Sequence, residues 1–518
     1  MACVIIKENG RKDAAAEKEF FNMNKPFILV TDSYTGFSKK GVNLLAGAIA
    51  SHLGYTVLPV LTYEETTEEL LAESTVVAVG RVATHPILEK YAKRGIISVP
   101  DAENGYAIRV CKDPDNKEKD VILIAGADEL GVLYACTDFC NKYFAKISLE
   151  GWYYRDGHFK QLLEAGLFPF SLSTAPRIPT RAIWTWGHMI YDYRGFFDNM
   201  ARLRLNEAVI WNDYCPINAE DIVSYAHSLG IKIVWGYAWG WDNSSKLEQM
   251  VAESDDAMLE RIKTKAIEVY EKQYKGIGDG IYFQSFTEIN KDSVNGKSVA
   301  DLVVRLVNET AGELLSRYPD LHIQFGLHAT SVKTKTDIIA KVDPRVYIVW
   351  EDCGAFPYSY RSDDRGGTVY THTPIPSPSF EDTFSLTDKL LTLRGEDERF
   401  GTVLKGLVCL DWGNFKHFSH PYVMGEYPKE YIKERSALKA PLWKSVTAGW
   451  LRNAELARKI VALIAEKNPA PIVEMLVEDG CFEDKIPLPV AVLAEMLWDA
   501  ERDTGEILEE VARYPGVC

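Results

Sequence analysis

The sequence predicts an α/β fold: a (β/α)8 barrel preceded by a small α/β domain and followed by a helical C-terminal region. Three observations lead to this prediction. Apolar strand-like segments alternate with amphipathic helical segments from residue 181 to residue 413. A shorter α/β pattern comes before them, and the sequence after Tyr431 is mostly helical in pattern. The composition agrees with a folded protein, since 47% of the 518 residues are hydrophobic and 25% are charged.

A chain of 518 residues is longer than one ordinary domain, so several domains are expected. Changes in the hydrophobic pattern divide the chain into four parts. Residues 1–24 are polar and form an N-terminal extension. Residues 25–165 form the small α/β domain, and a proline-bearing connection leads from it to the barrel domain at 180–450. Residues 451–518 form the C-terminal helical region.

The small domain is predicted from alternating apolar runs and amphipathic stretches. We expect its strands at 26–32, 56–61, 74–80, 105–110 and 121–127, and its helices at 41–54, 85–95 and 129–144. It contains neither a Gly-x-Gly-x-x-Gly turn nor a P-loop. The sequence therefore does not predict nucleotide binding.

The barrel domain is predicted from seven successive strand-then-helix steps. The strands are expected at 181–186, 206–213, 231–241, 279–288, 321–330, 345–354 and 403–413, and the helices between them at 193–205, 219–230, 255–274, 297–318, 334–342 and 385–395. An eighth strand is less distinct, and we place it near 445–450. This alternation is typical of the TIM barrel.

Charge and motif content exclude several functional classes. The net charge of -16, without any basic run, argues against nucleic acid and anionic membranes as partners. No secretory leader and no apolar run of membrane-spanning length is present, so we expect a cytoplasmic protein. The nine cysteines lack paired metal-ligand spacing, so the sequence predicts no metal and no cofactor. Assembly into a homo-oligomer is left open.

Candidate site residues follow from the barrel, whose active site lies at the C-terminal ends of its strands. Carboxylates and tryptophans are frequent at these predicted ends. The catalytic candidates are Glu288, Glu351, Asp352 and Asp411. The candidates for substrate binding are Trp186, His188, Asn212, Asp213, Trp239, Trp241, His328, Trp350 and Trp412.

This combination is typical of a carbohydrate site. Hydrolysis of a glycoside needs two carboxyl groups in different protonation states, and indole faces stack on sugar rings. Glu288 follows the apolar segment IYFQSF and suits a general acid. Its partner is Glu351, Asp352 or Asp411, with Glu351 favoured over the adjacent Asp352 because only one of two neighbouring strand residues points inward.

The segment 103–139 resembles part of the small α/β domain that precedes the barrel in β-N-acetylhexosaminidases and bacterial α-glucuronidases. The resemblance rests on a Gly-x-Asp-x-x-Gly-x-x-Tyr pattern at Gly126, Asp128, Gly131 and Tyr134. It implies the same two-domain fold and a glycoside hydrolase activity. Because we expect a cytoplasmic protein, the expected substrate is a short oligosaccharide or glycoside, cleaved from its end, rather than a polymer. The resemblance also implies a general acid at the end of the fourth strand, which is Glu288, and further carboxylates corresponding to Glu351, Asp352 and Asp411.

The sequence departs from the hexosaminidases at one position, since Thr287 stands where their pair of acids needs an aspartate. The resemblance is therefore closer to the α-glucuronidases, which invert with water as nucleophile. Two other functions stay open. One is a metal-dependent sugar isomerase or epimerase that uses Asp213, Glu288, His328 and Glu351 as ligands. The other is a sugar-binding protein without catalysis.

Overall fold

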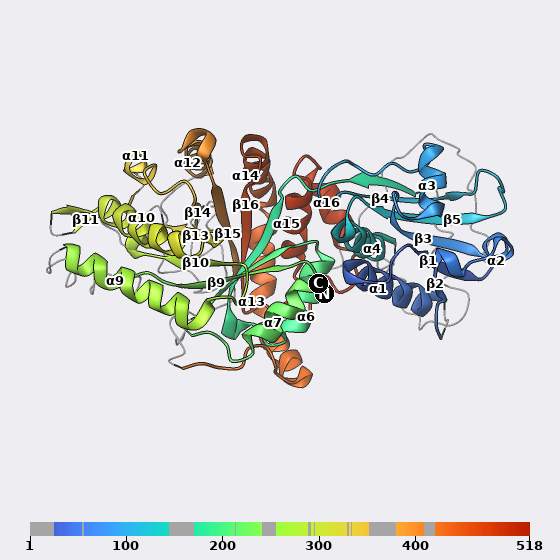
Figure 1. Cartoon of the computed structure of the whole chain (residues 1–518), viewed down its shortest axis with the longest axis horizontal. Helices are drawn as coiled ribbons and strands as arrows, with labels where there is room; N and C mark the ends of the chain where they lie inside the picture. Colours follow the sequence, from blue (N-terminus) through green and yellow to red (C-terminus); the bar gives the residue numbers. More distant parts are fainter. Residues whose placement is uncertain are drawn as a thin grey trace.

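The computed structural model describes a small sheet domain and a barrel, which share an interface formed by C-terminal helices (Figure 1). The described residues are 25–53, 56–143, 170–212, 214–240, 255–288, 292–294, 296–328, 331–332, 334–351, 380–408 and 420–518. Within these ranges, no helix combines the length and the apolar character needed to cross a membrane.

The N-terminal domain is a six-stranded sheet in the order β2-β1-β3-β5-β4-β6. Helices α1 and α4 pack against one face of the sheet, and the apolar side chains of α2 and α3 pack against the other face. Strands β1, β2, β3 and β5 are parallel, whereas β4 runs antiparallel to β5 and β6. The bounds are β1 Phe27–Thr31, α1 Gly36–Leu53, β2 Val60–Thr62, α2 Glu68–Glu73, β3 Thr75–Arg81, α3 Pro86–Lys93, β4 Tyr106–Lys112, β5 Asp120–Gly126, α4 Glu129–Tyr143 and β6 Phe170–Thr174.

The Gly-x-Asp-x-x-Gly-x-x-Tyr segment forms the turn from β5 into α4. Asp128 accepts hydrogen bonds from the backbone N–H groups of Asn104 (2.7 Å) and Gly131 (2.6 Å), which fixes the start of the helix. A Cβ at Gly131 would lie 2.5 Å from the carbonyl oxygen of Gly105, so only glycine fits. Tyr134 is buried with its ring 5.7 Å from the Arg181 guanidinium. The segment thus has a structural role at the domain interface.

Eight parallel strands form the closed barrel in the order β10-β13-β14-β15-β16-β7-β8-β9. The strands are β7 Thr180–Trp186, β8 Glu207–Trp211, β9 Lys232–Ala238, β10 Gly280–Gln284, β13 His322–Leu327, β14 Tyr347–Trp350, β15 Phe400–Val408 and β16 Ile472–Glu478. The helices are α6 Tyr193–Arg202, α7 Ala219–His227, α9 Asp255–Val269, α10 Val299–Arg317, α11 Thr336–Ile339, α12 Phe380–Leu390, α13 Lys429–Leu451, α14 Ala454–Lys467, α15 Leu488–Trp498 and α16 Thr504–Val511. A short hairpin, β11 Ser293–Val294 with β12 Lys297–Ser298, precedes α10. The predicted (β/α)8 fold is confirmed.

The eighth strand is β16, and the prediction of a strand near 445–450 was wrong. That segment belongs to α13, where Trp443, Val446 and Trp450 are buried at helical spacing. Strand β16 pairs with β15 on one side and with β7 on the other, which closes the barrel. Two positions of this strand are the acidic residues Glu474 and Glu478, which interrupt the apolar pattern although both side chains are buried.

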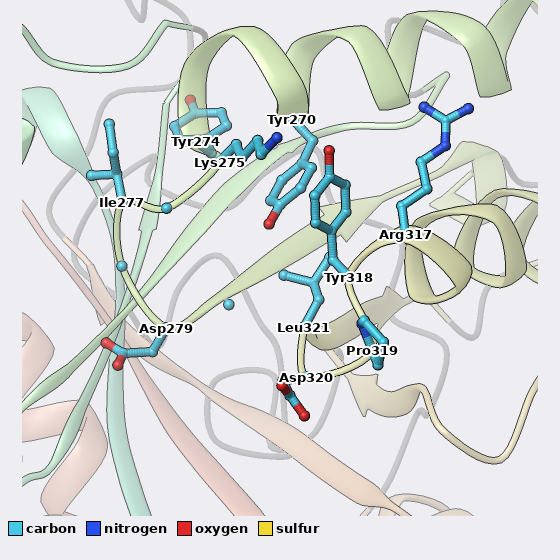
Figure 2. Close-up of a pocket in the computed structure, with 13 residues that line it drawn as sticks. Tyr270, Tyr274, Lys275, Ile277, Asp279, Arg317, Tyr318, Pro319, Asp320 and Leu321 are labelled. Atoms are coloured by element: carbon cyan, nitrogen blue, oxygen red, sulfur yellow. The ribbon is translucent and has the colours of Figure 1, made fainter.

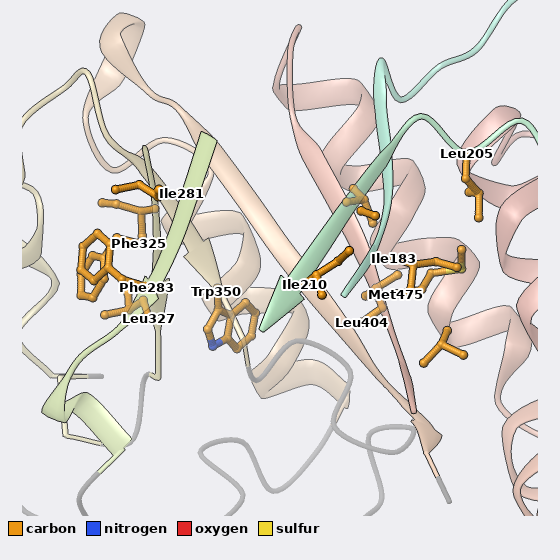
Figure 3. Close-up of a cluster of buried hydrophobic side chains, with 14 of the residues drawn as sticks. Ile183, Leu205, Ile210, Ile281, Phe283, Phe325, Leu327, Trp350, Leu404 and Met475 are labelled. Carbon is orange, nitrogen blue, oxygen red and sulfur yellow. The ribbon is translucent and has the colours of Figure 1, made fainter. Parts of the chain in front are cut away.

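Outward-facing strand residues pack against the surrounding helices and form the main core (Figure 3). Ile183, Phe283 and Met475 are among the buried side chains of this layer. Alternate residues point into the barrel, where a smaller cluster includes Trp184 and Tyr282. The polar residues described below lie on these inward positions, between apolar walls.

Candidate functional site

The described ends of three neighbouring strands place polar side chains at one face of the barrel. Gln284 is the last residue of β10, His328 follows β13, and Glu351 follows β14. Strand β13 pairs with both β10 and β14, so these ends are adjacent. This is the C-terminal face, where TIM barrels bind their substrates.

Glu351 is the centre of this group. Its Oε1 accepts hydrogen bonds from Tyr282 Oη (2.5 Å) and Gln284 Nε2 (2.6 Å), and Gln284 Nε2 also lies 2.7 Å from Oε2. His328 Nε2 lies 2.9 Å from Oε2, and Lys405 Nζ lies 3.9 Å from the same oxygen. The expected inward orientation of Glu351 is what the structure shows.

These neighbours determine the charge of Glu351. Burial opposes ionisation, but the His328 imidazole, the Lys405 ammonium and the Tyr282 hydroxyl favour the charged form and lower the pKa of Glu351. The carboxyl group is therefore ionised at neutral pH. A buried carboxylate surrounded by donors is suited to charge stabilisation or to activation of a nucleophile.

A second carboxyl group lies at the end of β16 and was not among the candidates from the sequence. Glu478 is buried and follows the inward-facing Leu476 by two residues, so it also points into the barrel. Burial and the neighbouring Asp479 raise the pKa of Glu478 to about 8, although Lys405 and the Trp186 indole oppose the shift. The apolar pattern of 472–477, interrupted by one acid, was the available signal for this strand.

Asp479, the residue after Glu478, fixes the end of β16. Its carboxylate accepts hydrogen bonds from Arg435 Nη2 (2.8 and 2.9 Å) and from Tyr191 Oη (2.9 Å), and it forms an ion pair with Lys439. Asp479 is buried, with a left-handed φ of 51°. Two cations from α13 therefore hold the turn that follows Glu478.

Two further carboxyl groups lie deeper in the barrel. Burial raises the pKa of Glu207 at the start of β8 to about 7, although Gln324 Nε2 donates a hydrogen bond to it (2.8 Å). Burial, together with the charges of Glu207 and Glu351, raises the pKa of Glu474 well above its usual value. Neither residue lies at the C-terminal face.

The predicted aromatic residues fall on both sides of the barrel wall. Trp186 points inward, with its ring 5.6 Å from that of Trp211. Trp239 and Trp350 point outward into the helix-packed layer and are completely buried, because strand alternation turns them away from the barrel axis (Figure 3 labels Trp350). Trp239 stacks on Phe283 with a centroid distance of 3.6 Å. These two indoles therefore present no face to a ligand.

His188 and Asn212 lie beyond the ends of β7 and β8. The ring of His188 is half-buried and lies 5.9 Å from that of Trp186. Asn212 is buried, and its Oδ1 accepts a hydrogen bond from Tyr422 Oη. Trp186, His188 and Asn212 are thus held near the same face as Glu351.

The remaining candidates lie outside the described part of the chain: Asp213, Trp241, Asp352, Asp411 and Trp412. Glu288 ends a short 3-10 turn, Phe286–Glu288, and only its backbone is described. Among the described side chains, no group of three His, Cys, Asp or Glu residues has the arrangement of a metal site.

A separate cavity of about 460 Å³ lies at the opposite end of the barrel (Figure 2). It is lined by Tyr274, Asp279 and Leu321, which lie just before the starts of β10 and β13, together with Arg317 and Tyr318. This location separates it from Glu351.

Comparisons with known proteins give only distant structural similarities. No protein-family model matches the sequence, and no curated protein matches it. The solved structures that are similar include an endo-1,4-beta-xylanase from Penicillium canescens (9% identity, 57% of this chain and 82% of that chain, TM-score 0.31). They also include an endo-beta-1,4-mannanase from Thermotoga petrophila (9% identity, 63% and 78%, TM-score 0.35) and an intracellular xylanase from Thermoanaerobacterium saccharolyticum (10% identity, 58% and 86%, TM-score 0.31). With these low TM-scores, the fold assignment rests on the strand register itself.

Proposed function

We propose that this chain is a glycoside hydrolase that uses Glu351 as its ionised carboxylate. The observation that supports this is the donor-lined Glu351 at the C-terminal face of a closed barrel. In the proposed reaction, Glu351 removes a proton from the attacking water or attacks the anomeric carbon itself. A second, protonated carboxyl group gives its proton to the leaving oxygen.

The finer parts of the proposal come from the sequence. The substrate is a short oligosaccharide or glycoside, cleaved from its end in the cytoplasm by an enzyme closer to α-glucuronidases than to hexosaminidases. Trp186, His188 and Asn212, which are held near the same face of the barrel as Glu351, contact the sugar. The family resemblance implies Glu288 as the proton donor, and the side chain of this residue lies outside the described part of the chain.

The test is hydrolysis of a panel of 4-nitrophenyl glycosides and uronides by the wild type and by Glu351→Gln. Glutamine keeps an acceptor for Tyr282 but cannot carry the charge, so we expect kcat to fall at least about 100-fold on the glycoside that the wild type cleaves. Thermal unfolding of both proteins checks that the variant is folded. EDTA should leave the wild-type rate unchanged.

Three outcomes would contradict the proposal. Full activity of Glu351→Gln would remove this residue from the mechanism. Loss of wild-type hydrolysis in EDTA would show that a metal ion takes part, which contradicts a mechanism carried by carboxyl groups alone. Absence of cleavage across the whole panel would contradict the hydrolase assignment.

A further inference from the structure

The barrel holds one carboxyl group that the sequence did not single out and that lies beside the proposed site. Glu478 is the last residue of β16, at the same face as Glu351. Strands β14, β15 and β16 are consecutive in the barrel, so β15 separates the two carboxyl-bearing strands. Neighbouring strands lie about 4.8 Å apart, which places the backbones of β14 and β16 roughly 10 Å from each other.

Lys405 of β15 links the two carboxyl groups. Its Nζ lies 3.9 Å from Glu351 Oε2, and its charge also acts on Glu478. Glu351 has several hydrogen-bond donors, whereas neither oxygen of Glu478 accepts a well-formed hydrogen bond from the described part of the chain. The two neighbouring environments therefore favour opposite protonation states, which is the arrangement expected of an acid–base pair.

We infer that Glu478 is the residue that protonates the leaving oxygen, opposite Glu351, an inference that rests on the proposed hydrolase function. The proton of Glu478 moves to the glycosidic oxygen, and the electron pair of the breaking C1–O bond moves to that same oxygen. The oxygen of a water molecule forms the new bond to C1 and gives its proton to Glu351. Proton exchange with solvent then restores both groups.

The groups around Glu478 favour a carboxyl group that stays protonated until it gives its proton to the leaving oxygen. Lys405 faces it from β15, and the Trp186 indole faces it from β7. Asp479 is the next residue in the chain after Glu478, and its carboxylate forms ion pairs with Arg435 and Lys439 of α13. Burial and Asp479 keep the pKa of Glu478 near 8, so the carboxyl is protonated at neutral pH and ionises only in mild alkali.

The test compares leaving groups, because only a poor leaving group needs a proton. The substrates are the methyl glycoside and the 2,4-dinitrophenyl glycoside of whichever sugar the wild type cleaves. For Glu478→Gln we expect kcat/KM to fall at least about 100-fold on the methyl glycoside and less than about fivefold on the dinitrophenyl glycoside. The alkaline limb of the wild-type pH profile, expected near pH 8, should disappear in this variant.

Glu474→Gln is the matched control, since it removes another buried carboxyl group from the same strand, away from the C-terminal face. It should keep the wild-type ratio between the two substrates. Glu351→Gln should be slow on both substrates, which separates the two roles.

The outcomes distinguish this inference from the proposed function. If Glu288→Gln shows the leaving-group dependence and Glu478→Gln does not, Glu288 is the proton donor and the inference is wrong while the hydrolase proposal stands. Equal losses of Glu478→Gln on both substrates would also overturn it. If the wild type cleaves no glycoside, the proposed function fails, and the inference with it.

Discussion

At the scale of single residues, the Glu351 site depends on a missing side chain as much as on the groups present. Gly326 of β13 faces the barrel interior beside Glu351, and a Cβ at this position would overlap Glu351 Oε1 and the Tyr282 hydroxyl. The backbone of Gly326 is not left-handed, so the requirement is steric. The hydrogen bond between Tyr282 and Glu351 can therefore form only beside glycine.

We expect Gly326→Ala to displace the Glu351 carboxylate. The added methyl group should lower the free energy of unfolding by about 1–3 kcal/mol, as overpacking of a closed interior does, and should lower kcat/KM at least about tenfold. Chemical denaturation and the glycoside assay measure the two effects. Gly312→Ala is the control, because a Cβ there meets nothing within 4 Å and lies inside α10. An unchanged rate in Gly326→Ala would show that the position of Glu351 is not critical.

Glu207 allows a test of the buried carboxyl groups that does not depend on activity. Burial raises its pKa from the usual 4.5 to about 7, so the folded protein keeps a proton that the unfolded chain releases. Stability from this group is therefore present in full below pH 4.5 and falls as pH rises towards 7. The loss is about 3 kcal/mol by linkage.

Glu207→Gln should remove this pH dependence while keeping the acceptor for Gln324. The free energy of unfolding of the variant, relative to the wild type, should therefore increase between pH 4.5 and 7 and stay constant at higher pH. Urea denaturation at pH 5 and pH 8 measures the difference. A constant difference over this range would show that Glu207 is ionised in the folded protein.

At the scale of elements, the sequence predicted seven strands of the barrel because their outward residues form apolar runs. It missed β16 because the inward positions of this strand carry Glu474 and Glu478, and burial of carboxyl groups is a property of the closed barrel that no local pattern reveals. A strand was expected at 445–450, where Val446, Thr447 and Trp450 have high strand propensity, whereas tertiary packing selects α13.

The same reasoning separates the predicted site residues. Alternation along a strand predicted that only one of Glu351 and Asp352 points inward, without deciding which. The same rule applied to Trp239 and Trp350 turns both indoles towards the helix layer. The donors to Glu351 come from β10, β13 and β15, which are far apart in sequence. Their convergence follows from barrel closure, so the pKa of Glu351 could not be anticipated from its neighbours in the chain.

At the scale of the whole molecule, one buried arginine joins the two domains away from the C-terminal face of the barrel. Arg204, which precedes β8, lies 2.9 Å from Asp138 of α4 and forms an ion pair with Glu495 of α15. It also donates a hydrogen bond to Tyr106 of β4 (2.6 Å). Lys142 lies 3.0 Å from Asp138 and Arg502 lies 3.4 Å from Glu495, so removing Arg204 leaves this buried network short of one positive charge.

Arg204→Met should therefore lower the free energy of unfolding by about 3–5 kcal/mol, because Asp138 and Glu495 would remain buried without their shared cation. If this network makes the two domains unfold together, calorimetry should show one transition in the wild type and two in the variant. Arg177→Met is the control, since the Arg177–Glu501 pair is exposed and should change stability by less than about 1 kcal/mol. A single, unshifted transition in Arg204→Met would mean that apolar packing around Trp498, whose ring lies 5.3 Å from that of Tyr106, holds the domains together without the ion pairs.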